Sequence, residues 1–401
     1  MMKGQELELY VHIPFCIQKC KYCDFLSAPA KRQVQNAYME ALLTEIAGKA
    51  AGCGIPDVRG ELPEEGQAPV RERPVCSVFI GGGTPSAVEP AWIGRVMEAL
   101  RAHFALRADA EISMEVNPGT VTRKSLRLYR EFGIRRLSIG CQSADEKELR
   151  TLGRIHTFDQ FLDTYRWARE TGFDNINVDL MSALPGQTIK HACRSVEAML
   201  QLDPPPEHLS VYSLIVEEGT AFCEQVQAGI LTLPDEDTER EIYWRIADFL
   251  ETNGYEHYEI SNYAKAGCRC IHNCGYWTGR EYLGFGLGAA SLYGHTRFSN
   301  TDTLDTYLAD PVHSAVQQET LRVQDQMAET MFLGLRMADG VSSGQFLARY
   351  GVEPTVPYRT QIASCMRDGL LRVTDAADGG TRLVLTRRGL DVSNYVFAKF
   401  L

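Results

Sequence analysis

The fold is decided by the segment Tyr10-Val-His-Ile-Pro-Phe-Cys16-Ile-Gln-Lys-Cys20-Lys-Tyr-Cys23-Asp-Phe25. Its cysteines have the spacing C-x3-C-x2-C, which brings three thiolates into one short loop able to wrap one face of a cubane cluster. Ordinary electron-transfer [4Fe-4S] sites use four cysteines, so three leave one iron open to a substrate or a cofactor. A zinc site completed by His12 or Asp24 and a set of reduced structural cysteines are the alternatives.

Six apolar runs rich in β-branched residues follow one another at the spacing of alternating strands and helices. The predicted strands are 7–13, 75–80, 111–116, 136–139, 176–181 and 209–214, and the predicted helices are 36–49, 91–103, 122–132, 158–171 and 188–202. Strands that alternate with helices predict a parallel sheet. Six units, rather than eight, indicate an α/β fold built as an open, partial (β/α)6 barrel.

Each predicted strand is followed directly by polar or glycine-rich residues. These tails are 15–25, 81–86, 117–119, 140–143, 182–188 and 215–219. In a (β/α) barrel, ligands bind at the carboxyl ends of the strands. We therefore expect all six tails to converge on one mouth.

The rest of the chain predicts a second, smaller domain, which a length of 401 residues allows. A linker at 231–237 and a helix at 238–253 precede a motif region at 257–294. From about residue 300 the pattern changes to helices, notably 326–337. Two short strands follow, 370–374 and 382–386, around an Asp378-Gly379-Gly380 turn, and Thr386 can cap a last helix. We predict a barrel domain at 1–299 and a helical, winged-helix-like domain at 300–401.

Composition limits the partners and the compartment. Forty-one basic against 52 acidic residues give a net charge of −11, which disfavours nucleic acid and anionic lipid. The first ten residues do not resemble a signal peptide, and no run of about 18 apolar residues could span a bilayer. We expect a cytoplasmic protein with no transmembrane segment. In such a chain, 12 cysteines indicate metal binding, catalysis or core packing rather than disulfides.

The cysteine segment resembles the signature of the radical SAM family, and more narrowly that of the oxygen-independent coproporphyrinogen oxidase group. In that family, three cysteines hold a [4Fe-4S] cluster whose open iron binds S-adenosylmethionine, and one electron from the cluster splits the sulfonium to a 5'-deoxyadenosyl radical. The resemblance implies that Cys16, Cys20 and Cys23 are the cluster ligands. It also implies an electron donor as a partner, while the barrel positions and shields the cofactors.

The same resemblance assigns the cofactor contacts. Gly82, Gly83 and Thr84 belong to a Gly-Gly-Gly-Thr-Pro turn that matches the methionine end of the cofactor, where glycines let the backbone approach closely. The remaining matches are Tyr10, Glu115, Gln142, Arg154 and Asp179. A carboxylate can accept protons from the amino or ribose hydroxyl groups, and Arg154 can pair with the cofactor's carboxylate.

Position 25 separates two subfamilies of the group. The oxidases of the group have the pattern C-x3-C-x2-C-x-C, whereas this chain has Phe25 in place of the fourth cysteine. That departure resembles the haem-chaperone subfamily, and so does the element His272-Asn-Cys-Gly-Tyr-Trp277. The resemblance implies a protein that binds haem and hands it to apoproteins, with room for transient contact with membrane proteins. Oxidative decarboxylation of coproporphyrinogen III is the alternative, and no catalytic residue is assigned.

His272 is the predicted haem ligand. A neutral imidazole binds haem iron, and Tyr276 and Trp277 could stack on a flat macrocycle. The alternative is that His272 and Trp277 fix a turn at the edge of the barrel. For Cys268, Cys270 and Cys274 the choice between free thiols, a second metal site and a thiolate for haem stays open. The C-terminal domain could cover the site or present a partner surface.

Overall fold

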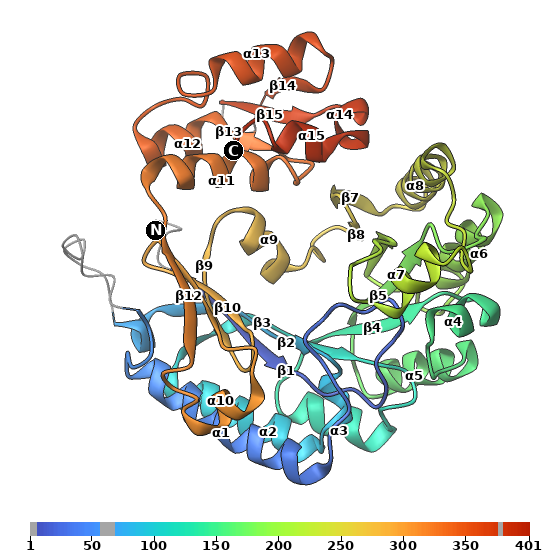
Figure 1. The fold of residues 1–401 in the computed structure, drawn as a ribbon, viewed down its shortest axis with the longest axis vertical. Coiled ribbons are helices and arrows are strands. Elements are labelled where there is room, and N and C mark those ends of the chain that lie inside the picture. The colour runs from blue at the N-terminus through green and yellow to red at the C-terminus, as the bar shows by residue number, and fades with distance from the viewer. Residues whose placement is uncertain (1–5, 57–68, 376–379) are drawn as a thin grey trace.

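The computed structural model describes residues 6–56, 69–375 and 380–401, and its main body is built on one 12-stranded sheet (Figure 1). The six predicted strands all form and run parallel in chain order: β1 (Leu7–Ile13), β2 (Pro74–Gly82), β3 (Ala105–Val116), β4 (Arg136–Gln142), β5 (Asn175–Ser182) and β6 (His208–Ser213). The α/β fold with a partial six-unit barrel is therefore confirmed.

The predicted helices cover the outer face of these strands (Figure 1). They are α1 (Arg32–Ala50), α2 (Pro90–His103), α3 (Arg123–Glu131), α5 (Phe158–Glu170) and α6 (Ile189–Leu200). Three of them begin where the sequence provides a threonine N-cap, whose hydroxyl accepts a backbone N–H in the first turn. Two short helices that the sequence pattern did not predict, α4 (Glu146–Leu152) and α7 (Ala221–Gln227), complete this part.

Elements after β6 extend the sheet at both edges without closing it. On one side β6 pairs antiparallel with β8 (Asn262–Ala264), which pairs with β7 (Glu256–Glu259). On the other side β1 pairs parallel with β9 (Glu281–Phe285). The remaining elements of this extension are α8 (Glu236–Thr252), α9 (Ile271–Trp277), β10 (Ala290–Tyr293), β11 (Thr296–Asn300), α10 (Leu304–Ala309) and β12 (Ala315–Thr320). Helix α9 lies between the barrel and the C-terminal domain (Figure 1).

The C-terminal domain has the helix and strand order of a winged helix and its own apolar core. Its elements are α11 (Val323–Gly334), β13 (Val341–Ser342), α12 (Ser343–Tyr350), α13 (Arg359–Arg367), β14 (Leu371–Asp375), β15 (Thr381–Leu385), α14 (Arg387–Asp391) and α15 (Ser393–Phe397). Thr386 caps α14 by accepting the Gly389 N–H at 3.0 Å, as predicted. The predicted turn at 378–380 falls largely on residues 378 and 379, which are outside the described residues.

The sheet of the barrel continues past residue 300, because β12 pairs with β11. We therefore propose a domain boundary at Leu321 instead of the predicted one at residue 300. The two domains meet where the Ala338 N–H donates to the Tyr258 carbonyl at 2.9 Å. Tyr258, Ala264 and Met337 form a small buried cluster at this contact. Among the described helices, none has the length and apolar character needed to cross a membrane.

Candidate functional site

Alternate residues of the six parallel strands point to opposite faces of the sheet. Leu137 and Ile139 of β4 belong to the apolar core under the helices, whereas Arg136, Ser138 and Gly140 line cavities inside the barrel. Two cavities result. The larger, of about 320 Å³, is lined by the tails of the strands and is called the mouth pocket. The smaller, of about 160 Å³, lies against α9 and is called the inner chamber.

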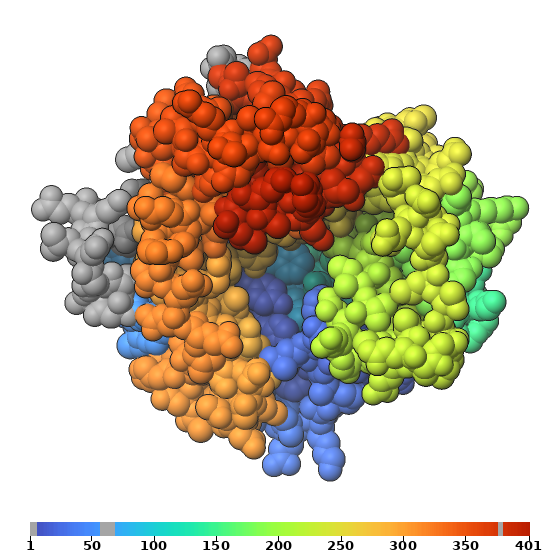
Figure 2. Space-filling view, turned by 45° about the horizontal axis from the view of Figure 1, so that its top comes forward, coloured from blue at the N-terminus to red at the C-terminus, as the bar shows by residue number. Residues whose placement is uncertain are grey.

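The cysteine loop leaves β1 and forms one wall of the mouth pocket. Backbone hydrogen bonds from Cys16 N to Ala28 O (3.2 Å) and from Ala28 N to Pro14 O (2.9 Å) close its base. Cys16, Cys20 and Cys23 all line the pocket, and none of the 12 cysteines is in a disulfide. Figure 2 shows a hollow between the C-terminal domain at the top and the segments near α7 and α8 at the right. Residues near the N-terminus, in blue, lie in the lower part of the view.

The surroundings of the three thiols fit a [4Fe-4S] cluster. Arg154 Nη1 donates to Cys20 Sγ at 3.6 Å and Thr84 Oγ1 donates to Cys16 Sγ at 3.5 Å, so donors already face two sulfurs. Burial raises the pKa of the Cys23 thiol, a cost that bonding to iron removes. Among the described residues, no three His, Cys, Asp or Glu side chains converge on the position of a single ion. A cubane does not need such convergence, because each thiolate binds a different iron.

The glycine turn after β2 packs directly against the cysteine loop. A Cβ on Gly83 would lie 3.0 Å from Cys16 Sγ, and one on Gly82 would lie 2.7 Å from the His12 ring. Gly82 also has a φ of 120°, which side chains rarely adopt. The turn therefore needs glycine at both positions, and it keeps backbone close to the place where a cluster-bound ligand would sit.

Two partly buried carboxyl groups face the cavities from β3 and β5, the strands on either side of β4. Glu115 Oε2 accepts the Gly82 N–H at 3.0 Å, and Asp179 accepts hydrogen bonds of 2.8 Å from Ser138 and from Asn177. Burial, followed by the charge of Asp179, raises the pKa of Glu115 to about 8. Burial also raises the pKa of Asp179. Both carboxyl groups are thus poised to bind a positively charged or hydroxyl-bearing ligand.

Arg154 is held rigidly at the rim of the mouth pocket. Its Nη2 donates to Asn117 Oδ1 at 2.6 Å and to the Gly140 carbonyl at 2.8 Å. Gln142 lines the same pocket and has a φ of 68°, an uncommon conformation for a residue other than glycine. The strained backbone turns Gln142 toward the mouth, where β4 ends.

The structure brings most of the predicted site residues together. The mouth pocket is lined by Cys16, Cys20, Cys23, Gly82, Gly83, Thr84, Glu115, Gln142, Arg154 and Asp179. Tyr10 and His272 line the inner chamber instead, which shares Glu115, Ser138, Asp179 and Tyr212 with the mouth pocket. Tyr10 bonds His12 Nδ1 at 3.0 Å, one layer below the cofactor pocket. Its role as a cofactor contact stays a prediction.

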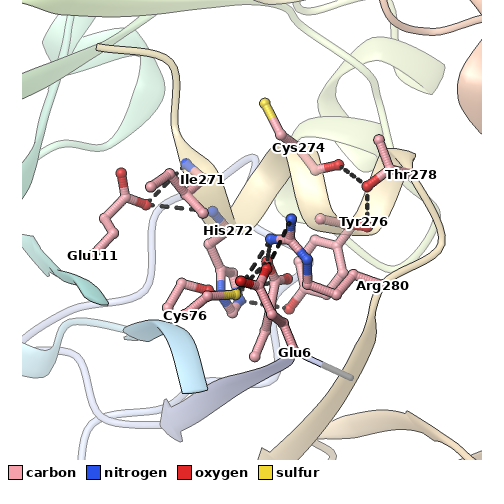
Figure 3. Close-up of polar contacts among 12 residues, drawn as sticks. Glu6, Cys76, Glu111, Ile271, His272, Cys274, Tyr276, Thr278 and Arg280 are labelled. Atoms are coloured by element: carbon pink, nitrogen blue, oxygen red, sulfur yellow. Dashed lines mark hydrogen bonds and ion pairs between the residues drawn. The ribbon is translucent and has the colours of Figure 1, made fainter. Parts of the chain in front are cut away.

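His272 lies on α9, deep in the molecule, with 1% of its surface exposed. Its Nδ1 shares a hydrogen bond with Ser77 Oγ and its Nε2 with the Tyr276 hydroxyl, both at 2.9 Å (Figure 3). Burial, with Arg280 and Arg136 nearby, lowers the pKa of His272 to about 3, so the imidazole is neutral. A neutral ring suits an iron ligand, but ligation requires one of these hydrogen bonds to break.

The three cysteines around α9, Cys268, Cys270 and Cys274, lie in different surroundings. Cys270 is buried, and its Sγ donates to Glu111 Oε1 at 3.5 Å. Cys268 and Cys274 pack at the edge of the cluster formed by Tyr258, Ala264 and Met337. Burial raises the pKa of all three thiols, which favours the protonated, apolar form.

Several residues at these cavities escaped prediction from the sequence. Asn117 and Ser138 hold Arg154 and Asp179, and Arg136 lines the inner chamber. The period-two alternation of Arg136, Ser138 and Gly140 with Leu137, Ile139 and Cys141 was the signal that could have found two of them. Asn117 stood in a predicted tail but had no distinguishing pattern.

Comparisons with known proteins identify the family of this chain. Residues 10–199 match the Radical SAM superfamily, and residues 321–392 match the HemN C-terminal domain. Over 396 residues, which cover 98% of both chains, the protein is 35% identical to the heme chaperone HemW of Bacillus subtilis. The chain belongs to the HemW family of radical SAM proteins.

Other relatives extend this HemW assignment. The heme chaperone HemW of Escherichia coli is 34% identical over 385 residues, with 94% of each chain covered. The coproporphyrinogen III oxidase HemN of Escherichia coli has the same fold, with a TM-score of 0.80 at 24% identity over 99% of this chain and 90% of that one. As a radical SAM protein of the HemW family, the chain has a [4Fe-4S] cluster and S-adenosylmethionine as its cofactors.

Proposed function

We propose that this protein is a haem chaperone, which binds haem and transfers it to apoproteins. The relatives named heme chaperone support this function. The observation that supports this function on the chain itself is Phe25, which occupies the position of the fourth cysteine in the pattern of the oxidases. Phe25 is 67% exposed and lies at the mouth pocket with Ile17 and Ile155, both also exposed. An apolar rim of this kind suits the edge of a porphyrin ring better than it suits water.

The residues around the mouth pocket would hold the resident cofactors. Cys16, Cys20 and Cys23 would ligate the cluster, which supplies one electron and an open iron when bound. We propose that S-adenosylmethionine is contacted by Gly82, Gly83, Thr84, Glu115, Gln142, Arg154 and Asp179. The buried carboxyl groups of Glu115 and Asp179 would orient its amino and hydroxyl groups, and the glycine turn would keep water away from the sulfurs.

The test of the rim is a haem titration of the cluster-loaded protein, followed by absorbance. We expect Phe25→Asp to weaken haem binding by about tenfold or more, because burying a phenyl ring is worth about 1.5–3 kcal/mol. Ile230→Asp is the matched control, since Ile230 is equally exposed but does not line the mouth pocket. Absence of stoichiometric haem binding by the unmodified protein would refute the function.

We propose His272 as the haem ligand, reached after its bond to Tyr276 opens. If so, Tyr276→Phe frees Nε2 and speeds the appearance of the histidine-ligated haem spectrum, whereas His272→Ala abolishes it. A His272→Ala variant that keeps the spectrum of the unmodified protein would show that the imidazole only packs α9 against β2. Melting curves of both variants exclude unfolding as the cause.

The partners follow from the proposed transfer. We infer an electron donor for the cluster and haem-accepting apoproteins, including acceptors at membranes that the protein contacts only transiently. The 12 free thiols support a reducing compartment, the cytoplasm, as the place of transfer. An anaerobic assay with reductant and coproporphyrinogen III tests the oxidase alternative: formation of protoporphyrinogen would favour that activity over the chaperone function.

A further inference from the structure

The inner chamber has the shape and lining of a binding site. Its walls include the aromatic rings of Tyr10, Phe79 and Tyr276 and the polar side chains of Arg136 and Asn273. It is continuous with the mouth pocket, because Glu115, Ser138, Asp179 and Tyr212 border both cavities. A ligand at the mouth can therefore extend one narrow arm inward, toward α9.

Arg136 is the unusual residue of this chamber. It comes first in β4, points into the barrel and is 2% exposed. Its Nε has no hydrogen-bond partner, and its guanidinium has no ion pair within 4.0 Å among the described residues. Buried arginines normally pair with carboxylates, because an unpaired buried charge costs several kcal/mol. Burial opposes the charge of Arg136, yet negative groups at a distance, Glu111 and Asp179 among them, outweigh burial and raise its pKa, so the guanidinium stays a cation without a carboxylate in direct contact.

The acidic groups nearest to Arg136 are engaged elsewhere. Glu111 Oε1 accepts the backbone N–H groups of Ile271 and His272 at the start of α9, at 3.0 and 3.3 Å. Asp179 is bonded to Ser138 and Asn177, as described above. The imidazoles of His272 and His208, which face the same interior, are kept neutral by burial, which lowers the pKa of each. The carboxylates of Glu111 and Asp179 partly offset the positive charge of Arg136, but none of these groups is hydrogen-bonded to its guanidinium.

We propose that the inner chamber is a carboxylate subsite and that Arg136 is its anchor. A carboxylate matches the guanidinium fork with two parallel hydrogen bonds, and the side-chain amide of Asn273, which has no hydrogen-bond partner among the described residues, lines the same wall. The aromatic walls suit the methylene groups of a short acid. A chamber of about 160 Å³ accepts such an arm but not a whole porphyrin.

The carboxylate has two sources, a free short-chain acid or a propionate arm of haem. The second source rests on the proposed function, because it requires haem at the mouth pocket. The shared chemistry is an alkyl carboxylate with a single charge.

The first experiment uses propionate and its neutral analogue propionamide on the cluster-loaded protein, read by melting temperature and calorimetry. We expect propionate, but not propionamide, to bind and to raise the melting temperature. We expect Arg136→Met to weaken propionate binding by at least about tenfold, and Arg136→Lys to retain part of it. Arg135→Met, a change at the exposed neighbour, should bind propionate like the unmodified protein. Equal binding by Arg136→Met, or no binding by the unmodified protein, overturns the subsite.

The unliganded variants separate a binding role from a structural one. Removal of an unpaired buried cation relieves its desolvation cost, so Arg136→Met should melt at the same or a higher temperature than the unmodified protein. A structural arginine would give a large loss of stability, and that result would count against the proposal.

The second experiment identifies the source by comparing haem with haem dimethyl ester, whose propionates are blocked. Tighter binding of haem by at least about tenfold, lost in Arg136→Met, assigns the carboxylate to haem. Equal binding of the two haems beside specific propionate binding assigns the subsite to a free acid. Failure of the protein to bind either haem refutes the chaperone function alone, and the propionate result still decides the subsite.

Discussion

The carboxyl group of Glu115 forms no ion pair among the described residues, and its removal from water inside the barrel ties the stability of the fold to pH. In the folded state its pKa is about 8, against an ordinary value of 4.5. The folded protein therefore holds a proton that the unfolded chain releases between these values. The contribution to stability is fully present below pH 4.5 and is lost as the pH rises through 8.

We expect Glu115→Gln to remove this dependence in the protein without cofactors. Between pH 4.5 and 8, the free energy of unfolding of the unmodified protein should fall relative to the variant by up to about 1.4 kcal/mol per pH unit. Denaturant unfolding at a series of pH values measures this difference. Parallel pH profiles of the unfolding free energy for the two proteins would show that the Glu115 carboxyl group does not hold this proton.

Gly275 packs directly against a buried carboxyl group. A Cβ at this position would overlap both carboxylate oxygens of Glu8, which lies under α9 and pairs with Arg280 at 2.6 Å. We expect Gly275→Ala to destabilise the protein by about 1–3 kcal/mol, as overpacking does. Gly344→Ala in α12 is the control, because nothing closer than 3.9 Å opposes its Cβ and alanine favours helix. Comparable free energies of unfolding for the two variants would argue against the contact.

At the residue scale, sequence patterns identified side chains that precede or follow a recognisable turn. Cys16, Gly82 and Glu115 belong to segments in which glycines, prolines or other cysteines mark the ends of strands. Arg136 gave no such signal, because it follows Arg135 at the start of an apolar run, and basic residues in such a position are usually exposed. Its burial depends on α9, which closes the barrel from a segment far along the chain.

At the level of elements, α9 begins on a carboxylate supplied by another element. Residue 270, its N-cap position, is a cysteine that makes no side-chain capping bond, and Glu111 of β3 accepts the first N–H groups instead. This explains how a seven-residue helix with a glycine persists. It also explains why the sequence did not predict α9 as a helix, since the cap comes from residues far away.

Glu111→Ala should therefore loosen α9 specifically. Loss of a helix cap costs about 0.5–2 kcal/mol, so the amides of residues 271–277 should exchange with deuterium faster. Glu98→Ala on α2 is the control. It also removes a carboxylate, but one that makes no hydrogen bond or ion pair among the described residues. Unchanged exchange in α9 after Glu111→Ala would mean that packing, not capping, holds the helix.

The six parallel strands were predictable because their buried faces are uninterrupted apolar runs. Strands β7 to β12 were not, because they are short and mixed in composition. In β12, for example, five of the six residues are exposed and the sequence is Ala-Val-Gln-Gln-Glu-Thr. Such strands are defined by the strands with which they pair more than by their own sequences.

For the whole molecule, the attachment of the C-terminal domain decides how firmly α9 is enclosed. Met337 is 7% exposed and packs with Tyr258 and Ala264, whereas Arg387 and Asp248 form an ion pair whose side chains are both 55% exposed. We expect Met337→Ala to cost about 2–5 kcal/mol. Arg387→Ala should cost less than about 1 kcal/mol, because water and salt screen exposed pairs. Denaturant unfolding measures the loss of unfolding free energy in both variants. A larger loss in Arg387→Ala than in Met337→Ala would contradict this prediction.

The open sheet has a consequence for self-association. A closed barrel has no free strand, but here β12 and β7 end the sheet. The C-terminal domain covers part of β7, through the Ala338 N–H bond to the Tyr258 carbonyl and a bridge between Glu259 and Met337, so β12 is the edge that could add a strand from another molecule. The β12 edge is polar, because it exposes Gln317, Gln318 and Glu319. Charge and polarity at an edge discourage aggregation through strand pairing. The polar edge of β12 thus limits self-association through strand pairing, while the exposed apolar side chains of Ile17, Phe25 and Ile155 remain available at the mouth, where haem would be exchanged.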